Sequence, residues 1–438
     1  WSSLLRGKPA LASLVVEQPD VLVTRAADGS IAVAGVQVPT THTGNDTTFS
    51  NWVLTQRAIV LRDGTLRWHD NQRKAPELAL RHIRAAIFNG AFQHRVALQA
   101  PPEGTVLKGA LDFRARFRHA PLAEIGKPTN WNGQAYLSTG PVDLPTLARY
   151  LKVPMKLHAG RIDNEIWASF SGGALRSARG RLQGTDVVLQ VRPAQPRLSV
   201  PVAQFGWAAE IEPQRDYRLR LSNLHAELGQ PPLADGTPVS RTLSFATLAG
   251  RYRVPDVEHG QLMSVAGDRV DLGVLAEFTR ALPVPERFRD ELVRFDPRGL
   301  VANYRIEVER ARPENALAAS EQRVSGTAPI VRYRFKGELE GISFAAQEPP
   351  PGLSPAGHPR AGLPGVENLW GSIDADEGHG SVTIDSTDTT LTLPGEFDDP
   401  RLAFDRLHGR GQWTVTPAPG HPHKAFAITV PELSVENA

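Results

Sequence analysis

The sequence alternates apolar and polar residues over many short stretches, and this period of two restricts the chain largely to β-strands with one dry face. Residues 111–118 read Leu-Asp-Phe-Arg-Ala-Arg-Phe-Arg, so a strand there would carry its apolar side chains on one face and its charged ones on the other. Strands buried on both faces, as in parallel sheets, read instead as continuous apolar runs. The pattern therefore predicts antiparallel sheet with one solvated side. It recurs at 78–80, 94–98, 166–170, 186–191, 217–221, 304–309, 331–336, 381–386 and 426–430.

Two short strings occur twice in the chain. The pattern V-D-L-x-x-L-A-x-Y/F stands at 142–150 and at 270–278, and F-x-x-L-x-G-R stands at 245–251 and at 404–410. Because both pairs keep the same order, we predict an internal duplication. The domains expected are an N-terminal β section over 1–141, a repeat unit over 142–269 with a capped helix and a β meander, and a second repeat unit over 270–438. Loop-like stretches near 311–328 and 347–365 would be insertions in that last unit.

Helices are expected to be few and short. In each repeated string an Asp, at position 143 or 271, stands where an N-cap side chain accepts hydrogen bonds from the free N–H groups of the first turn. The Leu and aromatic residues that follow are spaced to form one apolar stripe. A further short helix is predicted over 285–294. These helices would cross between strands rather than build a core of their own.

A sheet that is apolar on one face needs a cover, because large contiguous apolar patches are rare on soluble monomers. Three covers fit the alternation. A second sheet would give stacked sandwiches, a closed barrel would bury the face on itself, and an incompletely closed groove would leave room for apolar ligands. The alternation alone does not choose among them.

Composition excludes several classes of protein. The 438 residues include no Cys, so disulfides, thiolate metal sites and a Cys nucleophile are excluded, and an oxidising compartment suits such a chain. The net charge of +2 arises from 49 basic and 47 acidic residues, a balance unlike that of a nucleic-acid-binding protein. No stretch approaches the roughly 20 apolar residues of a membrane helix. Since the first residue is Trp1, we expect a piece of a longer protein.

Motifs that would carry chemistry are weak. Residues 374–378 resemble the start of a calcium loop, but position 385 is Asp rather than the expected Glu, so a hairpin tip is favoured. His69-Asp70 and His421-Pro422-His423 lack companions at the spacing of a catalytic triad or a metal site. The tryptophans on predicted strands are expected to pack rather than to form ligand platforms. The sequence thus predicts a protein that is not an enzyme and holds neither a cofactor nor a metal.

Scattered strings across nearly the whole chain resemble the YhdP family of AsmA-like proteins, which is related to the TamB-type proteins. The longest is L-R-D-G-T-L-R-W-H-D-N-Q-R at 61–73. Others are Leu5-Arg6-Gly7-Lys8-Pro9, Gln18-Pro19-Asp20, Asp28-Gly29-Ser30, Pro76-Glu77-Leu78-Ala79-Leu80, Asn89-Gly90, His94-Arg95, Pro101-Pro102, Leu282-Pro283-Val284-Pro285, Trp370-Gly371 and the two repeated helix strings.

This resemblance implies a bridge-like lipid-transfer protein of the Gram-negative cell envelope. Such a protein is anchored in the inner membrane through a segment not in this chain, crosses the periplasm as a long β groove, and carries phospholipid toward the outer membrane, where a partner is possible. The implied fold is mostly β, with tandem antiparallel sheet repeats forming an elongated, incompletely closed groove and with short crossing helices. One alternative is a periplasmic scaffold that assists outer-membrane protein assembly by strand augmentation. A carbohydrate-acting β protein would need a specific carboxylate pair, which is not evident.

The resemblance supplies phospholipid acyl chains as the ligand, and alternation supplies the residues that would contact them. The proposed lining residues, expected to share one continuous dry face, are Leu111, Phe113, Phe117, Leu219, Leu221, Ile306, Val308, Val331, Tyr333 and Phe335. If a second sheet covers that face, the same side chains are simply core.

Overall fold

The fold is taken from a computed structural model of the chain. The structure describes residues 11–38, 47–102, 107–151, 153, 155–193, 195–212, 215–229, 240–281, 286–315, 318–319, 328–348, 362–395, 397, 399–417 and 424–437. Strands dominate this part of the chain, and the chain separates into two compact units, which are described in turn. The first unit holds the strands up to β12, and the second holds the first part of β13 and the strands from β14 to β21.

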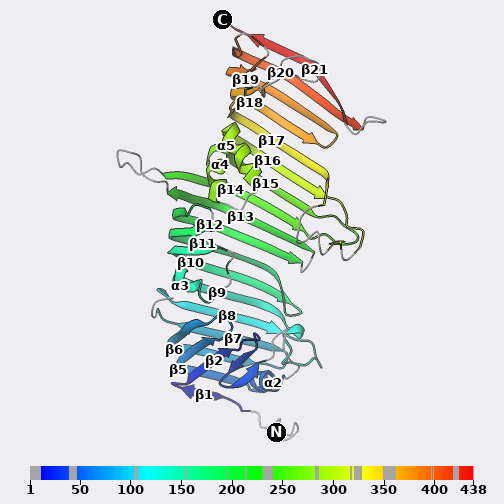
Figure 1. The fold of residues 1–438 in the computed structure, drawn as a ribbon. Helices are drawn as coiled ribbons and strands as arrows, with labels where there is room; N and C mark the ends of the chain where they lie inside the picture. The colour runs from blue at the N-terminus through cyan, green and yellow to red at the C-terminus, as the bar shows by residue number, and fades with distance from the viewer. Residues whose placement is uncertain are drawn as a thin grey trace, which may run out of the picture. The chain divides into compact units, whose positions relative to one another are not determined.

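The first unit is a β meander with an irregular start (Figure 1). Its strands are β1 (Leu14–Glu17), β2 (Asp20–Arg25), β3 (Ile31–Val33), β4 (Val36–Val38), β5 (Ala58–Asp70), β6 (Ala75–Asn89), β7 (Gln93–Ala100), β8 (Leu111–Arg118), β9 (Asn132–Asp143), β10 (Lys156–Ser171), β11 (Ala174–Gln190) and β12 (Leu198–Glu212). Its helices are α2 (Thr48–Thr55), the 3₁₀-helix η1 (Pro128–Asn130) and α3 (Leu144–Leu147). From β5 to β12 each strand pairs antiparallel with the next.

The start of the first unit departs from the antiparallel pattern. Strands β1 and β2 both pair with β5 in parallel, whereas alternation predicts antiparallel sheet throughout. Parallel pairing requires a crossover connection, and the chain between β4 and β5 contains helix α2, which the sequence analysis did not predict.

The second unit is an antiparallel meander in chain order. Its strands are β13 (Asp216–Gly229), β14 (Ser240–Arg253), β15 (Leu262–Asp271), β16 (Arg298–Arg310), β17 (Ile330–Phe344), β18 (Gly365–Asp376), β19 (His379–Thr392), β20 (Arg401–Pro417) and β21 (Lys424–Glu436), with helices α4 (Leu272–Ala281) and α5 (Glu286–Phe295). Antiparallel ladders join each neighbouring pair from β14 to β21. No ladder among the described residues joins the first and last strands of either unit. The prediction of a mostly-β chain with an incompletely closed antiparallel sheet and short helices is confirmed.

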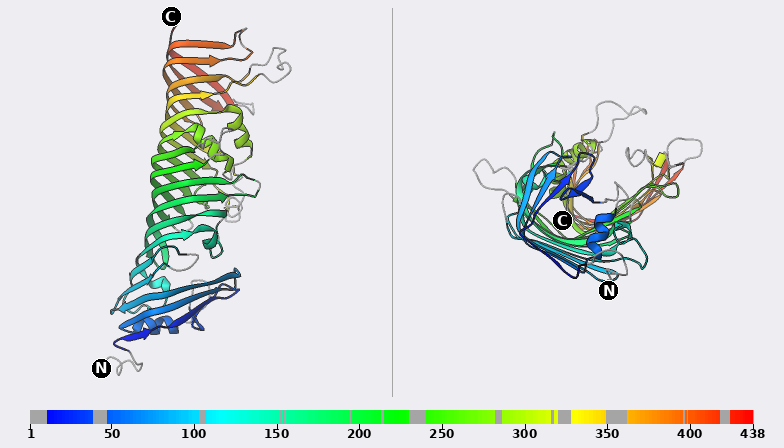
Figure 2. Two further views of the ribbon diagram at one scale, coloured as in Figure 1. Left: turned by 90° about the vertical axis from the view of Figure 1, so that its left-hand side faces the viewer. Right: turned by 90° about the horizontal axis from the view of Figure 1, so that it is seen from below.

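Many of the long strands contain a residue with positive φ that interrupts the ladder. In the second unit Asn303, Asn368 and Asp388 have φ values of 48°, 61° and 50°, and the register shifts or skips at each of them. Such β-bulges bend a strand and increase its local twist. Bulges in adjacent strands therefore account for the bend of the strands within the second unit, which can be followed in Figure 2. The strand residues with positive φ include Asp63, His82, Gly160, Asp186, Asn223, Asn303, Gly341, Asn368 and Asp388.

Both repeated Asp residues begin a helix. The Asp143 carboxylate accepts a hydrogen bond from the Thr146 N–H at 3.0 Å, and the Asp271 carboxylate accepts one from the Val274 N–H at 3.0 Å. Each cap directly follows a strand, β9 or β15. The two strings therefore form the same strand, cap and helix arrangement, as predicted. The helix predicted over 285–294 corresponds to α5.

A core cluster lies beside the capped helix of each unit. In the first unit Ile83, Leu107 and Val142 are buried, and Leu147 of α3 packs against them. In the second unit Phe245, Val270 and Ile342 are buried, and Leu272 and Leu275 of α4 pack against them.

The predicted loop insertions lie partly outside the described residues. The ends of the later one are ordered, because Gln347 pairs with Leu363 through two backbone hydrogen bonds of 2.9 and 3.0 Å, and β18 begins at Gly365. The stretch 347–365, predicted to be a loop, therefore has β pairing at both of its ends. In the earlier stretch Ala319 is buried and its N–H donates to the Asn315 carbonyl.

Candidate functional site

The ladders of the second unit place a set of apolar side chains on one face. Ile306 of β16 pairs with Val265 of β15 and with Phe335 of β17, and directly paired residues of an antiparallel ladder share a face. The same row continues through Ala375, Gly380, Trp413 and Ile428 of the four following strands. A parallel row holds Tyr252, Met263, Val308 and Tyr333. We call these residues the apolar face of the second unit.

This face is open to solvent over much of its extent. Ile306, Tyr333 and Met263 are 42%, 44% and 49% exposed, although the core of a sandwich would leave such side chains almost fully buried. No second sheet packs on these residues in the part of the chain that the structure describes. The exposed apolar side chains are therefore available to a ligand.

The opposite face of the same strands is charged. Residues between the apolar positions, such as Arg305, Arg334 and Lys336, pair across the ladders with one another or with acidic residues. The Arg334 guanidinium lies 3.2 Å from the Asp374 carboxylate, and Arg253 lies 2.6 Å from Glu309. Arg334 and Asp374 are exposed, and exposed ion pairs add little stability. The charged side chains nevertheless favour contact of this face with water.

The first unit has an equivalent apolar face. Phe113 of β8 pairs with Leu98 and Leu137, and the row continues through Ile166 and Gly180 to Trp207 of β12. Its members are half-buried, apart from the buried Gly180. Arg114 and Arg116 point to the other face, as the alternation predicts.

The predicted lining residues have different degrees of cover. Leu219 and Val331 are 47% and 49% exposed, and Leu221, Val308, Phe335 and Phe113 are half-buried. Tyr217, two residues before Leu219, lies with its ring 6.4 Å from that of Tyr252, which places Leu219 and Leu221 on the apolar face of the second unit. Leu111 packs against the core cluster of the first unit, and Phe117 is buried. Whether these residues contact lipid stays a prediction.

Phe117 belongs to a run of aromatic rings that we call the His94 stack. The rings follow one another as Phe92, His119, His94, Phe117 and Trp131, with centroid distances of 5.9, 5.3, 5.0 and 4.5 Å. His94 is fully buried. Its Nδ1–H donates to Asn89 Oδ1 at 2.7 Å, because the Asn89 amide N–H groups donate to the carbonyls of Val53 and Gln56. Burial, with a smaller contribution from His119, lowers the pKa of His94 to about 4.

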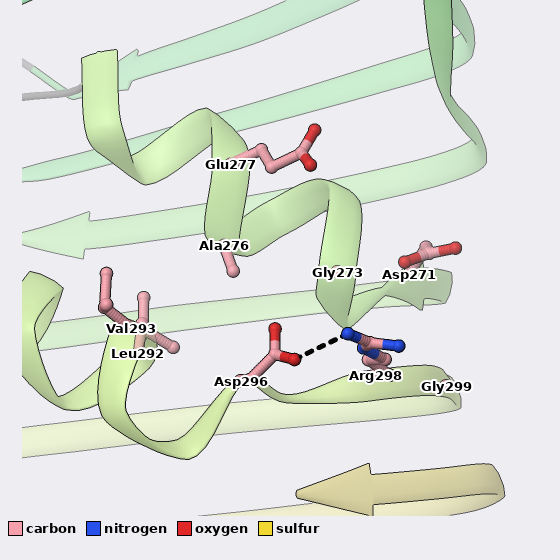
Figure 3. Close-up of a pocket in the computed structure, with 9 residues that line it drawn as sticks. All are labelled: Asp271, Gly273, Ala276, Glu277, Leu292, Val293, Asp296, Arg298 and Gly299. Carbon is pink, nitrogen blue, oxygen red and sulfur yellow. Dashed lines mark hydrogen bonds and ion pairs between the residues drawn. The ribbon is translucent and has the colours of Figure 1, made fainter. Parts of the chain in front are cut away.

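Helices cover one end of the apolar face in the second unit. Figure 2 shows the sheet bending toward the side on which α4 and α5 lie, and α4 packs on the core cluster there. A pocket of about 480 Å³ lies between the two helices and β16. Figure 3 shows that charged groups surround it, with the Arg298 guanidinium 2.7 Å from the Asp296 carboxylate. The open part of the face therefore lies farther along the strands, beyond the bulge at Asn303.

Asp70, of the His69-Asp70 motif, has a structural partner. Asp70 is buried and paired with Arg25. Burial raises its pKa, but hydrogen bonds from Arg25 and from the Arg73 N–H, together with the charges of both arginines, outweigh burial and hold the pKa of Asp70 below its usual value. Residues 374–378 form the tip of the β18–β19 hairpin, and the segment 421–423 lies outside the described residues. Among the residues that the structure describes, no three potential metal ligands cluster, and no helix has the length and hydropathy to span a membrane.

Sequence reasoning missed part of the apolar face. Val265 and Met263 alternate with small or polar residues in L-M-S-V-A-G-D, and Trp413 and Ile428 lie in strands whose pairing partners are distant in sequence. Period two within β15 could have found the first two. The other two require the register of the ladder.

Comparison with known proteins identifies the family of the chain. No curated protein and no solved structure has significant similarity to the chain. The model of the YhdP protein family matches residues 1–438, so the chain belongs to the YhdP family, a family of the bacterial cell envelope.

Proposed function

We propose that this chain is a section of a periplasmic bridge that carries phospholipid along its apolar β face toward the outer membrane. The observation that supports this most is the solvent-exposed apolar row across β15, β16 and β17, backed by a charged face in water. Membership of the YhdP family agrees with a role in the cell envelope. The protein would be held in the inner membrane by a segment outside this chain and would perform no reaction.

The chemistry of the face suits acyl chains. Burial of each methylene contributes roughly 0.8 kcal/mol, so a lipid tail would be held firmly out of water. The row presents apolar residues at successive strands, which are about 4.8 Å apart. Because neighbouring positions bind an acyl chain with similar free energy, the chain can move from one strand to the next without crossing a high energy barrier. Lipid head groups would stay at the solvated edge.

Photo-crosslinking in cells tests the proposal. A photoreactive residue at Phe335 should form phospholipid adducts, whereas the same residue at Arg334, which lies next in sequence on the charged face, should form none. Phe113 and Arg114 provide the matching pair in the first unit. The proposal fails if Phe335 and Arg334 yield equal adducts, or if neither yields any in a folded, abundant protein.

A charge on the apolar face should block transport without unfolding the chain. Val265 is 40% exposed, so Val265→Lys adds a charge to a partly solvated site rather than to a core. Its neighbour Ser264 points to the charged face, with its hydroxyl 3.5 Å from the Glu307 carboxylate, and Ser264→Lys is the matched control. We expect loss of phospholipid transfer with Val265→Lys alone. Equal transfer by both variants would contradict the proposal.

A further inference from the structure

Tryptophan rings on the apolar faces lie over glycines of the neighbouring strand. In the second unit Gly380 of β19 and Trp413 of β20 are direct ladder partners, and a Cβ atom placed on Gly380 would overlap the six-membered ring of Trp413. Only hydrogen therefore fits beneath that ring. The indole lies against the sheet rather than rising from it.

The same arrangement occurs in the first unit. Gly180 of β11 and Trp207 of β12 are ladder partners. A Cβ atom on Gly180 would overlap the Glu165 carbonyl oxygen and would lie 2.9 Å from Trp207 Nε1, so the backbone as well as the ring requires glycine there. A related pair, Gly267 and Tyr304, lies in the part of the second unit that α4 covers, where a Cβ would lie 2.5 Å from the Tyr304 oxygen. Glycine weakens strand interiors and is depleted there, so its repeated place beneath aromatic rings needs a reason.

We infer that the glycines opposite tryptophan set the depth of the apolar face, by letting the largest side chain of the row lie level with its small neighbours. This inference rests on the proposed function. In the second unit the row reads Ile306, Phe335, Ala375, Gly380, Trp413 and Ile428. Ala375 and Gly380 are the smallest members, and the ring of Trp413 covers the glycine. An acyl chain that crosses these strands then meets a flat stretch instead of an upright indole.

The inference identifies Gly380 as a positioning residue for Trp413. A side chain at position 380 meets the end of the Trp413 side chain rather than backbone, so the ring can swing away and the sheet can keep its register. The displaced ring would then stand in the space that the acyl chain occupies. Gly380→Val should therefore lower lipid binding more than it lowers stability.

Four variants of the chain test this. They are Gly380→Val, the milder Gly380→Ala, Trp413→Ala combined with Gly380→Val, and the control Ser381→Val, which places a valine one residue away on the opposite face. The probe is phosphatidylethanolamine carrying a pyrene-labelled acyl chain, titrated into detergent-free protein. We expect Gly380→Val to bind the probe about tenfold more weakly, which corresponds to about 1.4 kcal/mol. Gly380→Ala should fall between it and the parent, and the double variant and the control should bind as the parent does.

The outcomes separate the inference from the proposed function. If Gly380→Val binds the probe as the parent does, or if the double variant binds as weakly as Gly380→Val, the glycine does not act through the ring and the inference is overturned. If the parent itself binds no probe, the proposed function fails instead. In that case the position of the Trp413 ring can still be tested by acrylamide quenching of its fluorescence. The Trp413 contribution is obtained by subtracting the fluorescence of Trp413→Ala. Greater quenching in Gly380→Val supports ring displacement, and unchanged quenching refutes it.

Discussion

The His94 stack predicts that acid loosens the first unit at a defined place. His94 is fully buried and neutral, its Nε2 has no hydrogen-bond partner, and its pKa is lowered to about 4. In the unfolded chain the same imidazole has a pKa of 6.5. Between these two values the unfolded state binds a proton that the folded state does not, so the free energy of unfolding falls as the pH falls from 6.5 to 4.

The size of the effect follows from the two pKa values. A shift from 6.5 to about 4 makes the folded state about 2 kcal/mol less stable at pH 5 than at pH 7.5 through His94 alone. This corresponds to about a thirtyfold rise in the population of the open state. The stabilisation is fully present above pH 6.5 and continues to fall until the folded-state pKa is reached.

Hydrogen exchange measured by mass spectrometry checks this locally. After correction for intrinsic rates, peptides from β7 and β8 should exchange about thirtyfold faster at pH 5 than at pH 7.5. His94→Phe keeps a ring in the stack but cannot titrate, so most of the pH dependence should disappear. His69→Gln, which changes an exposed histidine of β5, should leave it unchanged. An undiminished pH dependence in His94→Phe would refute the reasoning, because the proton would then bind elsewhere.

Three other predictions concern the repeats, the loop and a half-buried ion pair. Asp143→Ala and Asp271→Ala each remove a helix cap, and each should lower the free energy of unfolding, measured by urea denaturation, by about 1 kcal/mol. Replacement of the same Asp by Asn, which can still cap a helix, should preserve most of that stability. Deletion of residues 350–360 should leave the melting temperature nearly unchanged, because backbone pairing of Gln347 with Leu363 holds the two ends of the loop together. A fall of many degrees in the melting temperature would contradict this prediction. The Arg251 guanidinium lies 2.6 Å from the Asp216 carboxylate and lowers the pKa of that carboxyl. Arg251→Met should therefore destabilise the chain near pH 7, and the difference from the parent should disappear as acid protonates Asp216. Denaturation curves at several pH values measure this difference.

Alternation allowed the strands and their faces to be predicted well. Leu111, Phe113 and Phe117 do share one face of β8, and Arg114 and Arg116 share the other. The helix caps were also predictable, since a short polar side chain before an apolar stripe has a local physical meaning. These features depend on residues within one strand or one turn.

Features that depend on register were not predictable. A single Asn or Asp within a strand, such as Asn303 or Asp388, has no local signature that separates a bulge from an ordinary polar position. Both nevertheless adopt positive φ, and the ladder of each strand with a neighbour shifts register around them. Likewise, the contact of Gly180 with Trp207 arises only after β11 and β12 are aligned. The parallel pairing of β1 and β2 with β5 depends on a crossover that no periodicity reveals.

The difference between a groove wall and a core also depends on context rather than on pattern. Phe117 and Ile306 stand in strands with the same alternation, and both were predicted to contact lipid. Phe117 is 6% exposed because His94 and Trp131 stack on its ring, whereas Ile306 is 42% exposed because helix α4 covers only the other end of its strand. Alternation thus assigns a side chain to a face, and the neighbouring elements decide whether that face meets protein or a ligand. On this reasoning, the residues of the second unit beyond the Asn303 bulge, rather than Leu111 and Phe117, are the ones to test for contact with lipid.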